Sequence, residues 1–183
     1  MSSKPYKESD TVNPIGVYGE TKRDGEKYVI HSSIDAIVIR TSWLYSCYGN
    51  NFVKTILRIA STNKELKVVY DQIGSPTYAK DLAKICLDIL SDNFLKQISE
   101  KGRLYHYSNE GEISWFEFAN AIIKFAKVVN CKVLPVRSED YKSKAKRPYY
   151  SVLDIGKIKK DFNLEIPHWK DSLINCIKKI KNK

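Results

Sequence analysis

The chain of 183 residues is long enough for an ordinary globular domain, and its 43% content of hydrophobic residues argues against a disordered protein. No apolar run reaches the length of a membrane span, and the residues after Met1 do not form a secretory signal. The net charge of +10 admits nucleic acid or a nucleotide phosphate as a partner, but no nucleic-acid-binding motif accompanies it, so no nucleic-acid partner is predicted.

The cysteines and histidines predict no metal site. The cysteines are far apart in the chain and have no zinc-site spacing, which favours reduced, buried thiols in a cytoplasmic protein. Each histidine is isolated and is expected at a helix end, in a strand or in a loop rather than as a ligand. These residues are Cys47, Cys86, Cys131, Cys176, His31, His106 and His168.

The first predicted elements alternate between helix and strand. Asn13 and Pro14 form the pattern of an N-cap followed by the first helical residue, and the predicted helix continues to about His31. The β-branched run "DAIVIR", from Asp35 to Arg40, predicts a buried parallel strand. After the loop "SCYGNN", the apolar spacing of "NFVKTILRIA" predicts a second helix, and "LKVVY" predicts a second strand.

The same alternation continues through the second half. "DQIGSPT" predicts a turn-rich loop, residues 81–90 a helix and "RLYHYSN" a strand. Ser114 and Glu117 form a capping box at the start of the predicted helix "WFEFANAIIKFAKVV", whose aromatic residues are expected in the core. "CKVLPV" is predicted to be extended and "RPYYSVLD" a loop, followed by a short helix and an amphipathic helix from about Trp169. This order predicts an α/β fold.

One usual part of such a fold is not in this sequence. An open parallel sheet that binds a dinucleotide commonly begins with a strand and a glycine-rich turn that holds the phosphates. This chain instead opens with a loop and a helix, and its eight glycines form no GxGxxG pattern. The part of the fold that would bind a dinucleotide is therefore expected outside this sequence.

Tyr18 and Lys22 are four residues apart in the first predicted helix, so they share one face of it. An ammonium group beside a phenol favours the phenolate, and such a phenol can give a proton to a carbonyl oxygen as hydride reaches the carbon. This is the chemistry of short-chain dehydrogenases/reductases. A YxxxK pattern also arises by chance, and the alternative is an exposed tyrosine beside a solvated lysine.

Four segments in order resemble one family of reductases. "NPIGVYGETKRDGE" resembles the active-site helix of extended short-chain reductases, in which Asn-Pro precedes YxxxK. "IVIRTSWLYSCYGNNFVKTILRIA", "VVYDQIGSPTYAKDLA" and "KAKRPYYSVLD" resemble successive segments of the dTDP-4-dehydrorhamnose reductase family. The resemblance covers nearly the whole chain but only the C-terminal portion of a family member, without the N-terminal glycine-rich half.

The resemblance implies the C-terminal part of a Rossmann-type short-chain reductase fold plus a small α/β substrate-binding lobe. Residues 1–62 would end the Rossmann core, and residues 63–183 would be mainly the substrate-binding lobe and C-terminal helices. The implied activity is reduction of the 4-keto group of dTDP-4-dehydro-L-rhamnose with NADPH or NADH, which yields dTDP-L-rhamnose for surface polysaccharide. The chain alone is expected to be inactive. The alternative is a non-catalytic, reductase-like binding or regulatory subunit.

The same resemblance implies roles for individual residues. Tyr18 would be the proton donor, Lys22 would tune it and hold the nicotinamide ribose, and Thr41 would lie at the cofactor. The family's third catalytic hydroxyl would precede Met1. The implied substrate-binding residues are Trp43, Asn51, Gln72, Gly74, Thr77 and Arg147. For Trp43 the alternative is a core tryptophan, for the "DQIGSPT" loop it is a turn with capping polar groups, and for Arg147 it is a solvated arginine.

The resemblance also has consequences for assembly. The strands "DAIVIR" and "LKVVY" are expected to lack neighbours in this chain, because a full family member supplies most of the sheet from its N-terminal half. The strand at Leu104 to Tyr107 is expected in the substrate-binding lobe with "LKVVY". Since exposed strand edges invite pairing with another chain, we expect a homo-oligomer, a rearrangement, or pairing with an N-terminal half.

Overall fold

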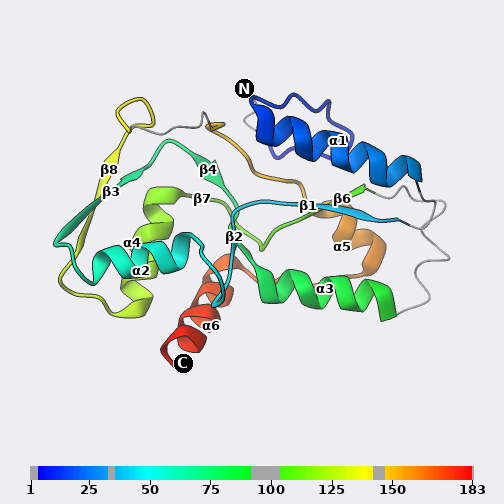
Figure 1. Ribbon diagram of the computed structural model, residues 1–183. Coiled ribbons are helices and arrows are strands. Elements are labelled where there is room, and N and C mark those ends of the chain that lie inside the picture. Colours follow the sequence, from blue (N-terminus) through cyan, green and yellow to red (C-terminus); the bar gives the residue numbers. More distant parts are fainter. Residues whose placement is uncertain (1–3, 33–35, 92–103, 142–146, 183) are drawn as a thin grey trace.

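A computed structural model describes residues 4–32, 36–91, 104–141 and 147–182 and confirms the α/β class (Figure 1). Asp35, the first residue of the predicted strand "DAIVIR", lies outside these ranges. The helices are α1 (Val17–Ser32), α2 (Phe52–Ala60), α3 (Ala79–Ser91), α4 (Trp115–Ala126), α5 (Gly156–Phe162) and α6 (Trp169–Lys181). The strands are β1 (Val38–Thr41), β2 (Leu44–Tyr45), β3 (Glu65–Val69), β4 (Ile73–Gly74), β5 (Thr77–Tyr78), β6 (Leu104–Tyr107), β7 (Ile113–Ser114) and β8 (Lys132–Val136).

One group of elements is built on β1 and β6, which pair in parallel with Arg40 opposite His106. Since side chains alternate along a strand, Ile39 and Tyr105 face α3 and α5, with which they form an apolar cluster. Arg40 lies on the opposite face and reaches α1. The strand Leu104–Tyr107 was expected in one lobe with "LKVVY", but it pairs instead with β1, the strand after the first helix.

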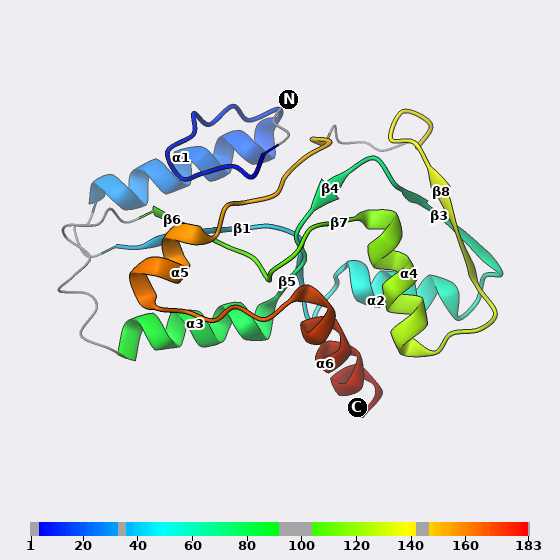
Figure 2. The same ribbon diagram turned by 180° about the vertical axis from the view of Figure 1, so that it is seen from behind.

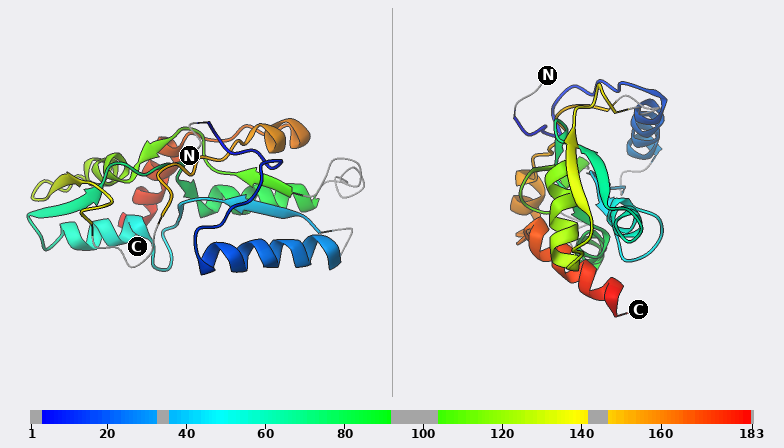
Figure 3. Two further views of the ribbon diagram at one scale, coloured as in Figure 1. Left: turned by 90° about the horizontal axis from the view of Figure 1, so that it is seen from above. Right: turned by 90° about the vertical axis from the view of Figure 1, so that its left-hand side faces the viewer.

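The second group contains the larger apolar cluster, formed by α2, α4, α6 and the long parallel pair of β3 and β8. The expectation that "DAIVIR" and "LKVVY" lack neighbours in this chain is wrong, because β1 pairs with β6, and Glu65 to Val69 pair with Lys132 to Val136. The two groups lie at opposite ends of the molecule (Figure 3), and α6, a member of the second group, lies near the middle of the molecule when it is viewed from behind (Figure 2).

Two short strand pairs lie at the junction of the groups. β2 pairs in parallel with β5, and β4 pairs antiparallel with β7. The predicted turn-rich loop, residues 71–77, contains β4 and the start of β5. The loop is therefore anchored on both sides, to the segment after β1 and to the segment before α4.

Several helix ends differ from the predictions for physical reasons. Helix α1 begins at Val17, because the first helical hydrogen bond runs from the Glu20 amide to the Gly16 carbonyl at 3.1 Å, so Asn13 and Pro14 lie before the helix. Helix α4 has the predicted capping box, but it ends at Ala126 because Lys127 adopts a left-handed conformation with φ of 59°. The start of α6 at Trp169 is confirmed.

All the cysteines are free thiols. Cys47, Cys131 and Cys176 are buried as predicted, but Cys86 is half-buried. Burial raises the pKa of the Cys176 thiol to about 12, so at neutral pH it is an unreactive core group. In the described ranges, no helix is long and apolar enough to cross a bilayer.

Candidate functional site

Tyr18 and Lys22 lie on one face of α1, as their spacing predicts. The Lys22 ammonium nitrogen is 5.4 Å from the centroid of the Tyr18 ring. Tyr18 is 77% exposed, and no described residue of α1 is buried. No hydrogen bond or ion pair joins this pair of side chains to the 71–77 loop among the described residues. Their geometry is therefore that of a surface acid with a neighbouring cation, and their role in chemistry stays a prediction.

Polar contacts hold α1 against the β1–β6 pair. The Arg40 guanidinium donates from Nε and Nη2 to the two oxygens of Glu26 at 2.7 and 2.6 Å, a bidentate pair across the helix–strand contact. Arg40 Nη1 lies 3.3 Å from His106 Nε2, and His106 Nδ1 lies 3.0 Å from the Tyr6 carbonyl oxygen. Because arginine only donates, His106 accepts at Nε2 and donates from Nδ1, as a neutral ring.

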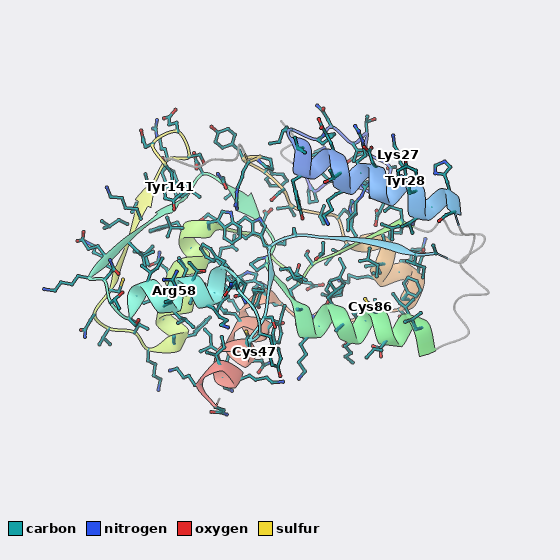
Figure 4. The ribbon with its side chains drawn as sticks, viewed as in Figure 1. Lys27, Tyr28, Cys47, Arg58, Cys86 and Tyr141 are labelled. Atoms are coloured by element: carbon teal, nitrogen blue, oxygen red, sulfur yellow. The ribbon has the colours of Figure 1, made fainter. Side chains whose placement is uncertain are left out.

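The outer side of α1 is open. Tyr28 is 76% exposed, and Figure 4 shows Tyr28 and Lys27 on this helix. Together with Asp24 and His31, they line a shallow surface pocket. None of the site residues predicted from the sequence is among these four residues.

Thr41, the predicted cofactor residue, ends β1 beside a predicted substrate residue. Its hydroxyl donates to Thr77 Oγ1 at 3.2 Å. Thr77 is fully buried, and its amide donates to the Trp43 carbonyl at 3.2 Å. The segment after β1 and the 71–77 loop are therefore joined at this point, so that Thr41, Trp43 and Thr77 form one neighbourhood.

Trp43 occupies an unusual backbone conformation and a tight aromatic contact. Its φ of 47° lies in the left-handed region, which is rare for a bulky residue and marks a position that its surroundings enforce. Its ring stacks on Trp115 with centroids 3.6 Å apart and planes 10° apart. A Cβ atom at Gly74 would lie 2.4 Å from the Trp43 ring, so only glycine fits there. Trp43 is therefore packed between α4 and the loop.

The 71–77 loop is mostly buried. Gln72 is 9% exposed, and Ser75 and Thr77 are more deeply buried. The Gln72 amide nitrogen donates to Ser138 Oγ at 2.8 Å, and the Ser42 hydroxyl donates to the Ser75 carbonyl at 2.9 Å. Two contacts to the segments on either side thus fix the path of the loop.

Asn51 and Arg147 do not share the contacts that join Trp43, Gly74 and Thr77. The Asn51 side chain caps α2 by accepting from the Lys54 amide at 3.2 Å, and it donates to the Ser46 and Tyr48 carbonyls at 2.8 and 3.1 Å. The side-chain amide of Asn51 is thus engaged with backbone. Arg147 is exposed, and no hydrogen bond or ion pair links it to another described residue.

The structure adds residues that the sequence interpretation did not assign to the site. Trp115 was expected in the core, but it is half-buried and stacks on Trp43. Ser138 contacts Gln72 from the loop after β8. Neither contact has a local sequence signal, since both join segments far apart in the chain. Within the described ranges, no group of three or more His, Cys, Asp or Glu side chains could hold a metal ion.

Comparisons with known proteins identify the family. The family described as RmlD substrate binding domain matches residues 1–182. The spore coat polysaccharide biosynthesis protein SpsK of Bacillus subtilis (strain 168) is 42% identical over 171 residues, which are 93% of this chain and 57% of SpsK. The dTDP-4-dehydrorhamnose reductase of Aggregatibacter actinomycetemcomitans is 40% identical over 180 residues, 94% of this chain and 60% of that protein.

A solved structure supports the same family assignment. The crystal structure of dTDP-4-dehydrorhamnose reductase from Bacillus anthracis in complex with NADP is similar with a TM-score of 0.85 and 36% identity. The similarity covers 96% of this chain and 59% of that one, so the chain spans about three fifths of the length of the relatives it matches. The resemblance drawn from the sequence motifs is confirmed, and the chain belongs to the RmlD substrate-binding-domain family.

Proposed function

We propose that this chain forms the acid-bearing helix and the substrate-binding part of a dTDP-4-dehydrorhamnose reductase. In that activity, the 4-keto group of dTDP-4-dehydro-L-rhamnose is reduced with NADPH or NADH to give dTDP-L-rhamnose for surface polysaccharide. The proposal is supported by the family membership and by two relatives that carry this name, one of them solved with NADP.

The observation that carries the proposal is the pairing of Tyr18 and Lys22 on one face of α1. When bound, NAD(P)H supplies the hydride. Tyr18 would give its phenolic proton to the sugar oxygen, and the Lys22 ammonium would favour the resulting phenolate and bind the nicotinamide ribose. The exposed face of α1 fits this assignment, because both side-chain ends are free to meet a ligand that this chain does not itself enclose.

The loop side of the site would bind the nucleotide sugar. We assign substrate contacts to Trp43, Gln72, Gly74 and Thr77, which the fold brings together, with Thr41 beside them at the cofactor. Asn51 and Arg147 stay candidates, the first for the substrate and the second for the diphosphate. Ligand sites commonly combine an apolar wall with a few placed polar groups, and we assign these roles to Trp43 and Gln72.

The test is a rate measurement on an assembled enzyme. The chain is co-purified with the segment of the Aggregatibacter actinomycetemcomitans reductase that it does not cover, and NADPH or NADH oxidation is followed with dTDP-4-dehydro-L-rhamnose. We expect Tyr18→Phe to lower kcat by about 100-fold or more, because general acid catalysis contributes on that scale. Tyr28→Phe, on the same helix and equally exposed, should leave kcat unchanged. Equal rates for wild type and Tyr18→Phe would refute the acid assignment.

A second candidate is a non-catalytic binding or regulatory subunit. It is favoured by the open outer side of α1, where Tyr28 is 76% exposed. The first candidate predicts that the chain alone binds dTDP but does not turn over, and that turnover appears with the added segment. A regulatory subunit predicts no turnover in either case, and a pure interaction module need not bind dTDP.

The assembly and location follow from the same proposal. We propose that residues 1–62 end the Rossmann core and that residues 63–183 are mainly the substrate-binding lobe, with β6 returning to the first part. The edge of β1 that faces away from β6 has no strand partner among the described residues, and we propose that it pairs with a second copy or with an N-terminal half. A cytoplasmic place suits the free thiols.

A further inference from the structure

Ser138 and Asp71 form a small polar cluster behind the 71–77 loop. The Ser138 amide donates to the two carboxylate oxygens of Asp71 at 3.1 and 3.0 Å, and the Ser138 hydroxyl donates to Asp71 Oδ1 at 2.6 Å. An ionised carboxylate only accepts hydrogen bonds. The hydroxyl proton of Ser138 is therefore committed to Asp71, and its oxygen lone pairs remain for other partners.

This arrangement decides which end of the Gln72 amide faces Ser138. Ser138 Oγ is an acceptor toward Gln72, so the side-chain nitrogen Nε2 must be the atom that approaches it, at 2.8 Å. The amide nitrogen and oxygen of a glutamine are otherwise assigned from the surrounding network, and here the carboxylate settles the choice. The carbonyl Oε1 is turned away from Ser138 and has no hydrogen-bond partner among the described residues.

The backbone at Gln72 is also held. The Trp115 amide lies 3.4 Å from the Gln72 carbonyl, and the Ile73 carbonyl accepts from the Ser151 amide at 2.9 Å and from its hydroxyl at 3.1 Å. Two residues on, the Trp43 ring packs on Gly74. Gln72 is 9% exposed and its neighbouring backbone is hydrogen-bonded, so the contact with Ser138 restrains rotation of its side-chain amide.

We infer that Ser138 is a positioning residue that acts through Gln72, turning the carbonyl Oε1 toward a hydrogen-bond donor of the bound nucleotide sugar. The inference rests on the proposed function, since the ligand is the dTDP-sugar of that proposal. Two donors fit an amide carbonyl: the N3–H of thymine and a sugar hydroxyl. Cytosine has a bare nitrogen in place of N3–H, so a held carbonyl would reject it.

The first experiment measures, by NMR and without any ligand, how firmly the side-chain amide of Gln72 is held. In wild type, we expect the two side-chain amide protons of Gln72 to be separately resolved by NMR and to exchange slowly with water. Ser138→Ala should speed their exchange, and Ser138→Thr, which keeps the hydroxyl, should restore it. Ser151→Ala is the matched control, because Ser151 contacts the same loop only at the Ile73 backbone. A freely exchanging Gln72 amide in wild type would overturn the inference.

The second experiment measures binding of dTDP, dCDP and dTDP-L-rhamnose to the same purified variants. We expect Ser138→Ala to weaken binding about fivefold to tenfold, the effect of one neutral hydrogen bond, and Ser151→Ala to change it little. If thymine is the donor, Ser138→Ala already weakens the binding of dTDP, and the preference of the chain for dTDP over dCDP decreases. If the sugar is the donor, the loss appears only with dTDP-L-rhamnose.

A double-mutant cycle shows whether Ser138 acts through Gln72. Adding Ser138→Ala to Gln72→Met should cause no further loss, because the group that Ser138 restrains is then gone. Additive losses, or unchanged binding of both dTDP and dTDP-L-rhamnose by Ser138→Ala, would overturn the inference. A wild-type chain that holds the Gln72 amide but binds none of these nucleotides would instead refute the proposed function, together with the ligand assigned here.

Discussion

Helix α1 and the 71–77 loop are held in opposite ways, although both contribute to the candidate site. None of the described side chains of α1 is buried, and its firmest attachment is the Arg40–Glu26 ion pair. The loop is buried from Gly74 to Thr77 and is bonded to segments on both sides. The side of the site to which we assign the substrate is thus held by packing within this chain. The position of the acid-bearing helix depends on polar contacts and on whatever covers its open face.

The largest expected difference is in stability. Phe118 is fully buried and contacts the rings of Tyr45, Phe52 and Trp169, so Phe118→Ala should lower the free energy of unfolding by about 3–5 kcal/mol. Tyr28→Ala removes an aromatic ring from α1 and should cost within about 0.5 kcal/mol, because that ring is mostly in water. Urea denaturation measures both. Similar losses for the two variants would remove the distinction between the regions.

A pair of glycines provides an intermediate test. A Cβ at Gly74 would overlap the Trp43 ring, so Gly74→Ala should destabilise by about 1–3 kcal/mol and weaken dTDP binding. A Cβ at Gly25 in α1 meets nothing within 4 Å, so Gly25→Ala should stabilise by about 0.5–1 kcal/mol through the gain in helix propensity. Thermal unfolding with a dTDP titration measures both changes. A loss of stability for Gly74→Ala with a gain for Gly25→Ala would support the difference between the loop and α1. Changes of the same sign would contradict it.

The smallest expected effect is a dependence on pH. Burial lowers the pKa of His106 below its ordinary value of 6.5, against the opposing pull of Glu8 and together with the repulsion of Arg40. The unfolded chain then binds the proton first, so the stabilising contribution is complete above about pH 6.5 and is lost as the pH falls through the lowered pKa of His106.

Because His106 bridges Arg40 and the Tyr6 carbonyl, α1 should lose amide protection before α4 does when the pH is lowered. Hydrogen exchange between about pH 7 and pH 5 follows both helices. The variant His106→Gln should flatten the dependence, and His31→Gln, at the exposed end of α1, should leave it unchanged. Simultaneous loss of protection in α1 and α4 would show that the helix is not held separately.

Local features of the fold could be predicted from the sequence. The capping box of Ser114 and Glu117 and the apolar spacing of α2 depend on residues within one or two turns, and both are confirmed. The partner of β6 could not be predicted, because a short apolar strand does not specify which neighbour it pairs with. The ends of α1 and α4 were misplaced for a related reason: backbone conformations at Gly16 and Lys127 follow from the surrounding structure.

The candidate site also contains features that the sequence could predict and features that it could not. The closeness of Tyr18 and Lys22 follows from the helical period, so the motif alone was enough to predict it. The stack of Trp43 on Trp115 and the contact of Ser138 with Gln72 each join residues more than 60 positions apart. No local pattern marks such contacts, because they exist only after the elements have packed. These are also the contacts that hold the residues to which we assign the substrate.

The parallel pairing of β3 with β8 also bears on how the chain is made and folded. Glu65 lies opposite Lys132, and in the other group Val38 lies opposite Leu104, so both ladders join segments that are far apart in the chain. Closing such loops costs entropy before any ladder bond forms, which makes folding slow and non-local. On the ribosome, β3 has no partner until β8 has emerged. A nascent chain that stalls before that point would expose an unpaired apolar strand to other chains.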